Sequence, residues 1–168
     1  NAIDACNTRA ALEYSWGTEF LEMEEARMMN SMRPPYQPKI SIVYNSMTQR
    51  LMVEDNGIGM NGQDIERYVS KIGKSYYTSE SFEKQQLDYE PVSQFGMGML
   101  SCFTVSRAML IEAKKDKCVN TAWNIADQQE IEAITAKWLE GTEEIEYITS
   151  NRETSGTKIT LVLKPQYA

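Results

Sequence analysis

The segment VEDNGIGMNGQD, residues 53–64, most strongly limits what this chain can fold into. It carries three glycines with the Gly-x-Gly-x-x-Gly spacing of dinucleotide-binding proteins: Gly57, Gly59 and Gly62. That fingerprint requires a parallel strand–helix–strand unit. Here the preceding strand, residues 50–54, follows a strand-like run at 39–45 across a turn at 45–49, which predicts an antiparallel hairpin. Asp55 at the end of the hairpin would also repel a pyrophosphate, so the pattern argues against a Rossmann fold.

An aspartate followed by glycines suits a different ligand. A carboxylate accepts hydrogen bonds, and the exocyclic amino group of adenine can donate one, in a charge-assisted bond of roughly 1.5–3 kcal/mol. Gly57 and Gly59 would let the backbone approach the base closely, and Met60 could lie against its ring. A tight turn with an exposed Asp55 is the alternative interpretation of this segment alone.

Composition excludes several classes of chemistry. The chain has no histidine, which removes every mechanism with an imidazole base. Its net charge of −7 disfavours nonspecific nucleic-acid binding. The three cysteines are widely spaced, so we expect buried thiols in a reducing compartment rather than a zinc site or a disulfide framework. No apolar run approaches the roughly 18 residues that span a bilayer, and we expect a cytoplasmic protein without membrane contact.

The order of predicted elements indicates an α+β fold in one domain, residues 1–168. Helical periodicity covers residues 2–30, and a short helix is predicted at 63–72. The polar and aromatic stretch 73–95 is predicted to be a long loop of the kind that often forms a lid. An apolar helix follows the glycines at 96–98. Further strands are predicted at five runs: 107–113, 118–125, 130–136, 143–149 and 157–163.

Three more segments could serve a nucleotide, although each also has an ordinary structural interpretation. In QFGMGM (94–99), glycines before a helix offer N–H groups to an anion. In NAIDA (1–5), Asn1 and Asp4 lie on one helix face, and an amide oxygen is a plausible Mg²⁺ ligand. In GTKITL (156–161), the Thr157 hydroxyl could support Asp55.

Together, in this order and spacing, the four segments resemble the GHKL ATPase superfamily, the Bergerat-fold group of gyrase B, heat-shock chaperones, histidine kinases and MutL. Within it, KISIVYNSMTQRLMVEDNGIGM, IGKS and SQFGMGMLSCFTVSRAMLIEAKK are most similar to the nucleotide domain of the heat shock protein 90 chaperones. The resemblance covers most of 1–114 and 155–164. It implies a two-layer α/β sandwich whose mostly antiparallel sheet has helices on one face.

The resemblance also implies roles for individual residues. Asp55 would bind adenine with Thr157 through a shared water, and Asn1 would hold Mg²⁺ and phosphates. The remaining nucleotide-binding positions that it implies are Asp4, Ala5, Gly59, Met60, Lys74, Gly96, Met97, Gly98 and Met99. The 73–95 segment would be the ATP lid. The implied cofactors are ATP or ADP with Mg²⁺.

The general base is not among these residues. In the family it is a glutamate four residues before the position of Asn1, and we expect this chain to be a fragment of a longer protein because it begins with Asn1 rather than Met. The resemblance further implies downstream domains, a homodimer in the full-length protein, and client proteins.

Two other functions stay open on the sequence. One is an ATP-gated dimerisation module of a DNA-acting protein, like MutL or the MORC-type ATPases, whose N-x-x-D-A box is shared. The QFGMGMLS box favours the chaperones, and the acidic charge makes nucleic-acid contact by this domain unlikely. The other is a domain that binds ATP without hydrolysing it.

Overall fold

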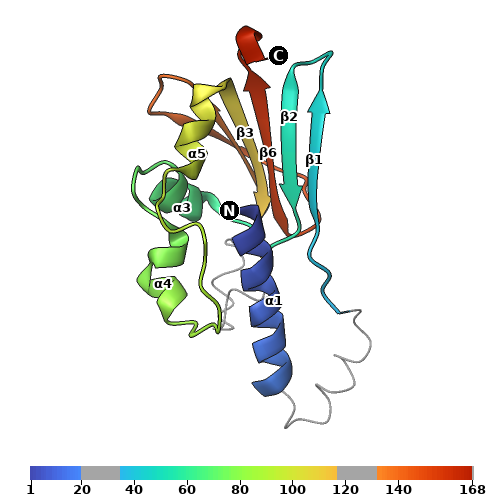
Figure 1. The fold of residues 1–168 in the computed structure, drawn as a ribbon, viewed down its shortest axis with the longest axis vertical. Helices are drawn as coiled ribbons and strands as arrows, with labels where there is room; N and C mark the ends of the chain where they lie inside the picture. Colours follow the sequence, from blue (N-terminus) through green and yellow to red (C-terminus); the bar gives the residue numbers. More distant parts are fainter. Residues whose placement is uncertain (20–34, 117–131, 168) are drawn as a thin grey trace.

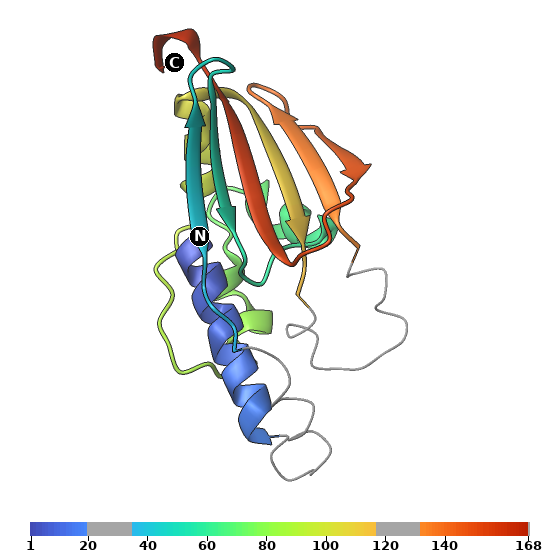
Figure 2. The same cartoon turned by 90° about the vertical axis from the view of Figure 1, so that its right-hand side faces the viewer.

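A computed structural model of the chain describes residues 1–19, 35–116 and 132–167. In these residues it contains a six-stranded antiparallel sheet in the order β1-β2-β6-β3-β4-β5 (Figures 1 and 2). The strands are β1 (Ile40–Asn45), β2 (Arg50–Asp55), β3 (Ser106–Lys114), β4 (Ile134–Leu139), β5 (Ile145–Thr149) and β6 (Gly156–Leu163). The last strand in sequence is thus inserted between β2 and β3, which joins the two halves of the described chain.

The helices pack on one face of this sheet (Figure 1). They are α1 (Ala2–Glu19), α3 (Gly62–Asp64), α4 (Glu80–Glu83) and α5 (Gly98–Ser101). The described residues also contain a π-helical turn at Ile65–Val69 and 3₁₀ turns at Tyr76–Thr78, Cys102–Thr104 and Pro165–Tyr167. The predicted α+β architecture, with a mostly antiparallel sheet and helices on one face, is confirmed. None of the helices in the described ranges has the length and apolarity to span a bilayer.

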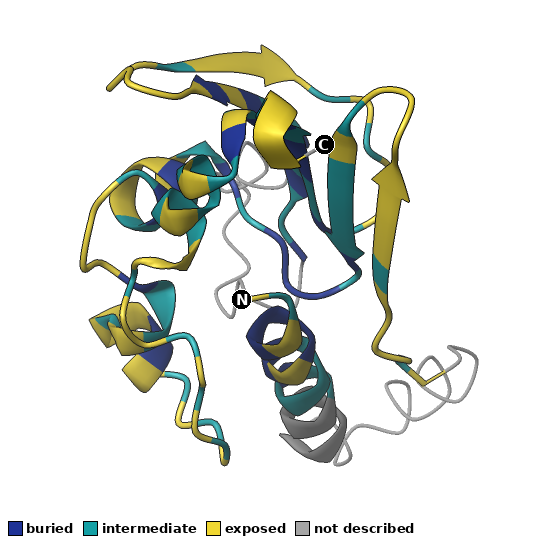
Figure 3. Ribbon diagram, turned by 45° about the horizontal axis from the view of Figure 1, so that its top comes forward, coloured by how far each residue is buried: buried dark blue, intermediate teal, exposed yellow. Residues whose placement is uncertain are grey.

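The main core lies between the sheet and two parts of the helical layer, the π-helical turn and the segment from α5 through the 3₁₀ turn after it. Side chains alternate across a strand, so Met109, Leu161 and Trp138, which are register neighbours on β3, β6 and β4, share the covered face. The π-helical turn adds Ile65 and Val69 to the same cluster. Ala5 and Leu12 of α1 form a second, smaller cluster with Ile58. Figure 3 shows burial concentrated in the central strands, whereas β1 and β5 at the edges are exposed.

Most strands occur where the sequence predicts them, and the hairpin of β1 and β2 agrees to within a residue. The prediction for 130–136 is wrong in its bounds, because β4 runs over Ile134–Leu139. Its core-facing residues are Ala136 and Trp138, and the outward Lys137 pairs with Glu146 at 3.3 Å. The predicted strand 118–125 and the helix beyond residue 19 lie outside the described residues.

The segment 73–95 has more structure than the predicted loop. Ser75 and Ser79 cap short helical turns through their hydroxyls. Phe82 is buried and makes edge-to-face contacts with Tyr76, Tyr77 and Tyr89, at centroid distances of 5.5–6.1 Å. Aromatic packing therefore orders a stretch whose polarity predicted a loop.

Candidate nucleotide-binding site

Asp55 and Thr157 lie side by side where β2 ends and β6 begins. They are register partners and both are buried. Asp55 Oδ1 accepts the N–H of Gly57 at 2.9 Å and the N–H of Thr157 at 3.3 Å. Burial raises the pKa of Asp55 above its ordinary value, and the two N–H donors and the Arg152 guanidinium only partly oppose this.

The loop after Asp55 is pressed against α1. The Ile58 N–H donates to the Ala5 carbonyl at 3.1 Å, and a Cβ on Gly57 would lie 2.5 Å from the Ala5 carbonyl carbon. Gly59 has a φ of +65°, and a Cβ there would lie 1.9 Å from the Lys114 carbonyl oxygen. Both glycines are therefore required by close backbone packing, a reason separate from any ligand.

Gly62 has a different place in the structure. It opens α3, and Asn61 before it caps the helix in a reciprocal capping box with Asp64. The third glycine of the fingerprint spacing thus belongs to the start of a helix, and it follows an antiparallel strand rather than a parallel one.

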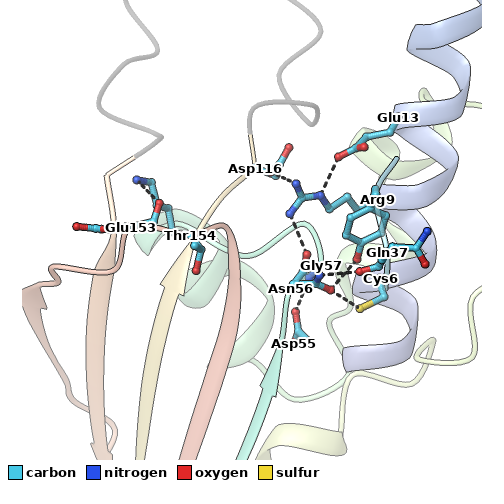
Figure 4. A network of polar contacts seen from close by, with 12 residues as sticks. Cys6, Arg9, Glu13, Gln37, Asp55, Asn56, Gly57, Asp116, Glu153 and Thr154 are labelled. Atoms are coloured by element: carbon cyan, nitrogen blue, oxygen red, sulfur yellow. Dashed lines mark hydrogen bonds and ion pairs between the residues drawn. The ribbon is translucent and has the colours of Figure 1, made fainter. Parts of the chain in front are cut away.

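A polar network ties α1 to the residue that follows Asp55 (Figure 4). Arg9 donates to the Asn56 carbonyl oxygen at 2.9 Å and pairs with Asp116 at 3.1 Å and Glu13 at 2.9 Å. The Arg9 guanidinium also lies 4.6 Å from the centre of the Tyr36 ring.

The Asn56 side chain connects the loop after β2 to the segment before β1. Its Nδ2 donates to the Gln37 carbonyl at 2.8 Å, and its Oδ1 accepts the Lys39 N–H at 2.7 Å and the Tyr36 hydroxyl at 3.0 Å. The segment before β1 is thereby attached to the loop after β2.

Asp4 lies under the predicted lid. Asp4 is only 1% exposed, and its two carboxylate oxygens accept the N–H groups of Val92 at 3.0 Å and Ser93 at 2.8 Å. One turn along α1, the hydroxyl of Thr8 contacts that of Tyr89. The carboxylate of Asp4 therefore attaches the end of the 73–95 segment to α1.

The N-terminus of α1 meets the second glycine segment. A Cβ on Gly98 would lie 3.8 Å from both amide atoms of the Asn1 side chain, so this side chain lies beside the start of α5. Gly96 has a φ of +64° and packs against the backbone of Lys74. Lys74 is exposed. The structure thus brings the N-terminal segment, the 73–95 segment and the glycine segment together.

The predicted methionines divide into two groups. Met60 and Met99 are partly buried and pack against the main core. Met97 is 56% exposed at the start of α5. The described residues contain no cluster of three or more acidic, cysteine or histidine side chains that could hold a metal.

Sequence reasoning missed Arg9, Asn56 and Arg152. Arg9 follows Ala5 by four positions on α1, so helical periodicity places it on the face that meets the glycine loop. Arg152 pairs with Glu54 at 2.8 Å and lies near Asp55. Nothing in the local sequence of Arg152 indicates that it lies near Glu54 and Asp55. The pairing of β6 with β2 brings the segment before β6, which carries Arg152, close to the end of β2.

Comparison with known proteins agrees with this architecture. Residues 1–157 match the family model of the histidine kinase-, DNA gyrase B-, and HSP90-like ATPases. The chain is 29% identical over 137 residues to the chaperone protein HtpG of Helicobacter hepaticus, covering 79% of this chain and 20% of that protein. It is 33% identical over 134 residues to HtpG of Psychrobacter cryohalolentis, covering 77% of this chain and 18% of that protein.

A third HtpG, from Treponema pallidum, is 31% identical over 118 residues, which are 64% of this chain and 18% of that protein. The chain thus spans about a fifth of the length of these chaperones. The family match covers nearly the whole chain, including the segments at 1–5, 53–60 and 94–99 and the first two residues of the fourth, Gly156 and Thr157. The chain belongs to the family of histidine kinase-, DNA gyrase B-, and HSP90-like ATPases.

Proposed function

We propose that this domain binds an adenine nucleotide, with Asp55 accepting a hydrogen bond from the adenine amino group. The observation that carries the proposal is the arrangement of the Asp55 carboxylate. The Asp55 carboxylate accepts two hydrogen bonds from the described residues, and both are accepted by Oδ1. Oδ2 is therefore left to accept a hydrogen bond from a ligand. A carboxylate whose pKa is raised by burial is typical of a functional site.

Thr157 would support the base from the same sheet face, since it is the register partner of Asp55. Ala5, Gly59 and Met60 would lie around the adenine. Ala5 contacts the glycine loop directly, and Gly59 is buried beside the end of β3.

The phosphates would lie at the N-terminus of α1 and the glycine segment. The Asn1 side chain lies beside Gly98, so an amide side chain and the backbone of residues 96–99 would be available together. Lys74, packed against Gly96, would contribute positive charge, and Asp4 would keep the lid in place. Mg²⁺ commonly takes one or two protein ligands and completes its shell with phosphates and water, which the Asn1 amide oxygen fits. Bound there, the ion would neutralise phosphate charge.

We further propose that the longer protein is a chaperone like HtpG that hydrolyses ATP, acts as a homodimer and binds client proteins. The support is the family membership and the similarity to three HtpG proteins. The general base would be the glutamate that the family resemblance predicts before the position of Asn1. Closure of the 73–95 segment would exclude water from the nucleotide.

Calorimetric titration with ADP and GDP, each with and without Mg²⁺, tests the proposal. Guanine carries a carbonyl oxygen where adenine has its amino group, and this oxygen would face a carboxylate. We expect ADP to bind and GDP to bind at least about tenfold more weakly, which corresponds to the loss of one charge-assisted hydrogen bond. Equal binding of the two nucleotides, or no binding of ADP, would contradict the assignment.

A further inference from the structure

One peptide unit connects α1 to the Asp55 carboxylate. Its carbonyl oxygen belongs to Asn56 and its N–H to Gly57. The carbonyl accepts a hydrogen bond from Arg9 Nη1 at 2.9 Å, and the N–H donates to Asp55 Oδ1 at 2.9 Å. A peptide unit is planar, so the direction of the carbonyl fixes the direction of the N–H. Hydrogen bonds at both ends of one amide also strengthen each other.

Arg9 is itself held in one orientation. Glu13 accepts from Nε at 2.9 Å, Asp116 pairs with Nη2 at 3.1 Å, and the ring of Tyr36 lies under the guanidinium. Asp116 is buried, and its N–H donates to the Ile58 carbonyl at 2.7 Å. The guanidinium therefore reaches the peptide from a rigid frame that spans α1, the end of β3 and the glycine loop.

We propose that Arg9 is a positioning residue for adenine recognition, which acts through the peptide between Asn56 and Gly57 to keep Oδ1 of Asp55 engaged and Oδ2 directed at the base. The proposal rests on the proposed function of Asp55. It assigns part of the adenine specificity to a side chain that touches no nucleotide. Without Arg9 the peptide can rotate, the Gly57 N–H leaves Oδ1, and the carboxylate loses its fixed direction.

A double-mutant cycle on ADP binding tests the link, with Arg9→Met, Asp55→Asn and the combined variant. Met keeps much of the apolar stem but donates no hydrogen bond. We expect Arg9→Met to weaken ADP binding about tenfold in the wild-type background, the usual size of one charged hydrogen bond. In the Asp55→Asn background the same change should weaken it less than about twofold, because residues that act as one unit are not additive.

Glu13→Gln is the matched control. It removes the negative charge that pairs with Arg9 at a partly exposed position, keeps an oxygen that can accept from Nε, and leaves the contact with Asn56 in place. ADP affinity should then change less than about twofold. Arg9→Lys is a second variant in case Arg9→Met does not fold. Lysine keeps the charge but lacks the planar guanidinium, whose two terminal nitrogens reach Asn56 and Asp116 at the same time. ADP binding should therefore weaken in this variant too.

The Gly57 amide provides a readout that needs no nucleotide. Its hydrogen exchange, measured by nuclear magnetic resonance, should accelerate in both Arg9 variants and stay unchanged in Glu13→Gln. Equal loss of ADP affinity in the two Asp55 backgrounds, or an unaltered Gly57 amide, would overturn the role of Arg9. If the wild-type domain binds no ADP, the proposed function fails and this inference with it. If ADP binds but the cycle is additive, only the role of Arg9 fails.

Discussion

Asp55 and Thr157 are neighbours across β2 and β6, and the Thr157 N–H donates to Asp55 Oδ1 at 3.3 Å. This pair places a buried carboxylate at the end of the sheet, beside the glycine loop and the first turns of α1. The sheet order makes the pairing possible, because β6 is inserted between β2 and β3. The candidate site therefore exists only when the first and last parts of the described chain are folded together.

The first prediction concerns stability and pH. The pKa of Asp55 is raised above 3.8 in the folded domain, mainly by burial, so the folded state binds this proton more tightly than the unfolded state does. Ionisation of Asp55 then lowers the free energy of unfolding at pH values above the raised pKa, and this cost disappears as the pH falls below the unfolded value. Asp55→Asn should therefore be more stable than wild type at neutral pH, by a margin that shrinks on acidification.

Urea denaturation at neutral and acid pH measures this difference. Asn keeps an oxygen that can accept the Gly57 and Thr157 N–H groups, so the exchange is nearly isosteric. Asp88→Asn, at an exposed position in the 73–95 segment, is the control for removing a negative charge. A less stable Asp55→Asn at neutral pH would mean that the carboxylate stabilises the empty domain.

The second prediction concerns Gly59. It has a φ of +65°, and a Cβ at this position would lie 1.9 Å from the Lys114 carbonyl oxygen, so alanine would collide with backbone. Gly59→Ala should lower the free energy of unfolding by more than about 3 kcal/mol. Gly141→Ala is the matched control, since Gly141 has a φ of +76° with nothing within 4 Å, and should cost only about 1–2 kcal/mol. Similar losses in the two variants, measured by denaturation, would show that the contact with Lys114 does not matter.

The third prediction concerns the attachment of the 73–95 segment to α1. Asp4 accepts the Val92 and Ser93 N–H groups with separate oxygens. In Asp4→Asn one oxygen becomes an NH₂ group, which cannot accept the second N–H. Hydrogen exchange at Val92 and Ser93 should accelerate, and proteolysis within 73–95 should become faster. Asp88→Asn in the same segment should change neither. Unchanged protection at Val92 and Ser93 would show that the aromatic packing of Phe82 alone holds the segment.

The regular elements could be predicted because they carry local patterns. Alternation identifies β1, β2 and β6, and apolar periodicity identifies the start of α1. The bounds of β4 could not be predicted, because runs 130–136 and 134–139 both alternate. The second run is the one whose Trp138 packs against Phe103, a contact that the local pattern does not reveal. The ordered turns within 73–95 were missed because they depend on burial of Phe82 among tyrosines, a tertiary arrangement that the local pattern does not reveal.

The candidate site was predictable only in part. The positions of Asn1, Asp55, Gly98 and Thr157 follow from motifs, and the structure brings Asp55 to Thr157 and Asn1 to Gly98. Their roles toward a nucleotide stay predictions. The contacts of Arg9 could not be predicted, because they depend on side-chain directions from three separate elements.

The central claim is that Asp55 binds adenine, and calorimetric titration of ADP into wild type and Asp55→Asn tests it most directly. We expect roughly hundredfold weaker binding in the variant, from the loss of about 2–3 kcal/mol, with the fold intact by circular dichroism. Unchanged ADP affinity in a folded Asp55→Asn domain would contradict the account.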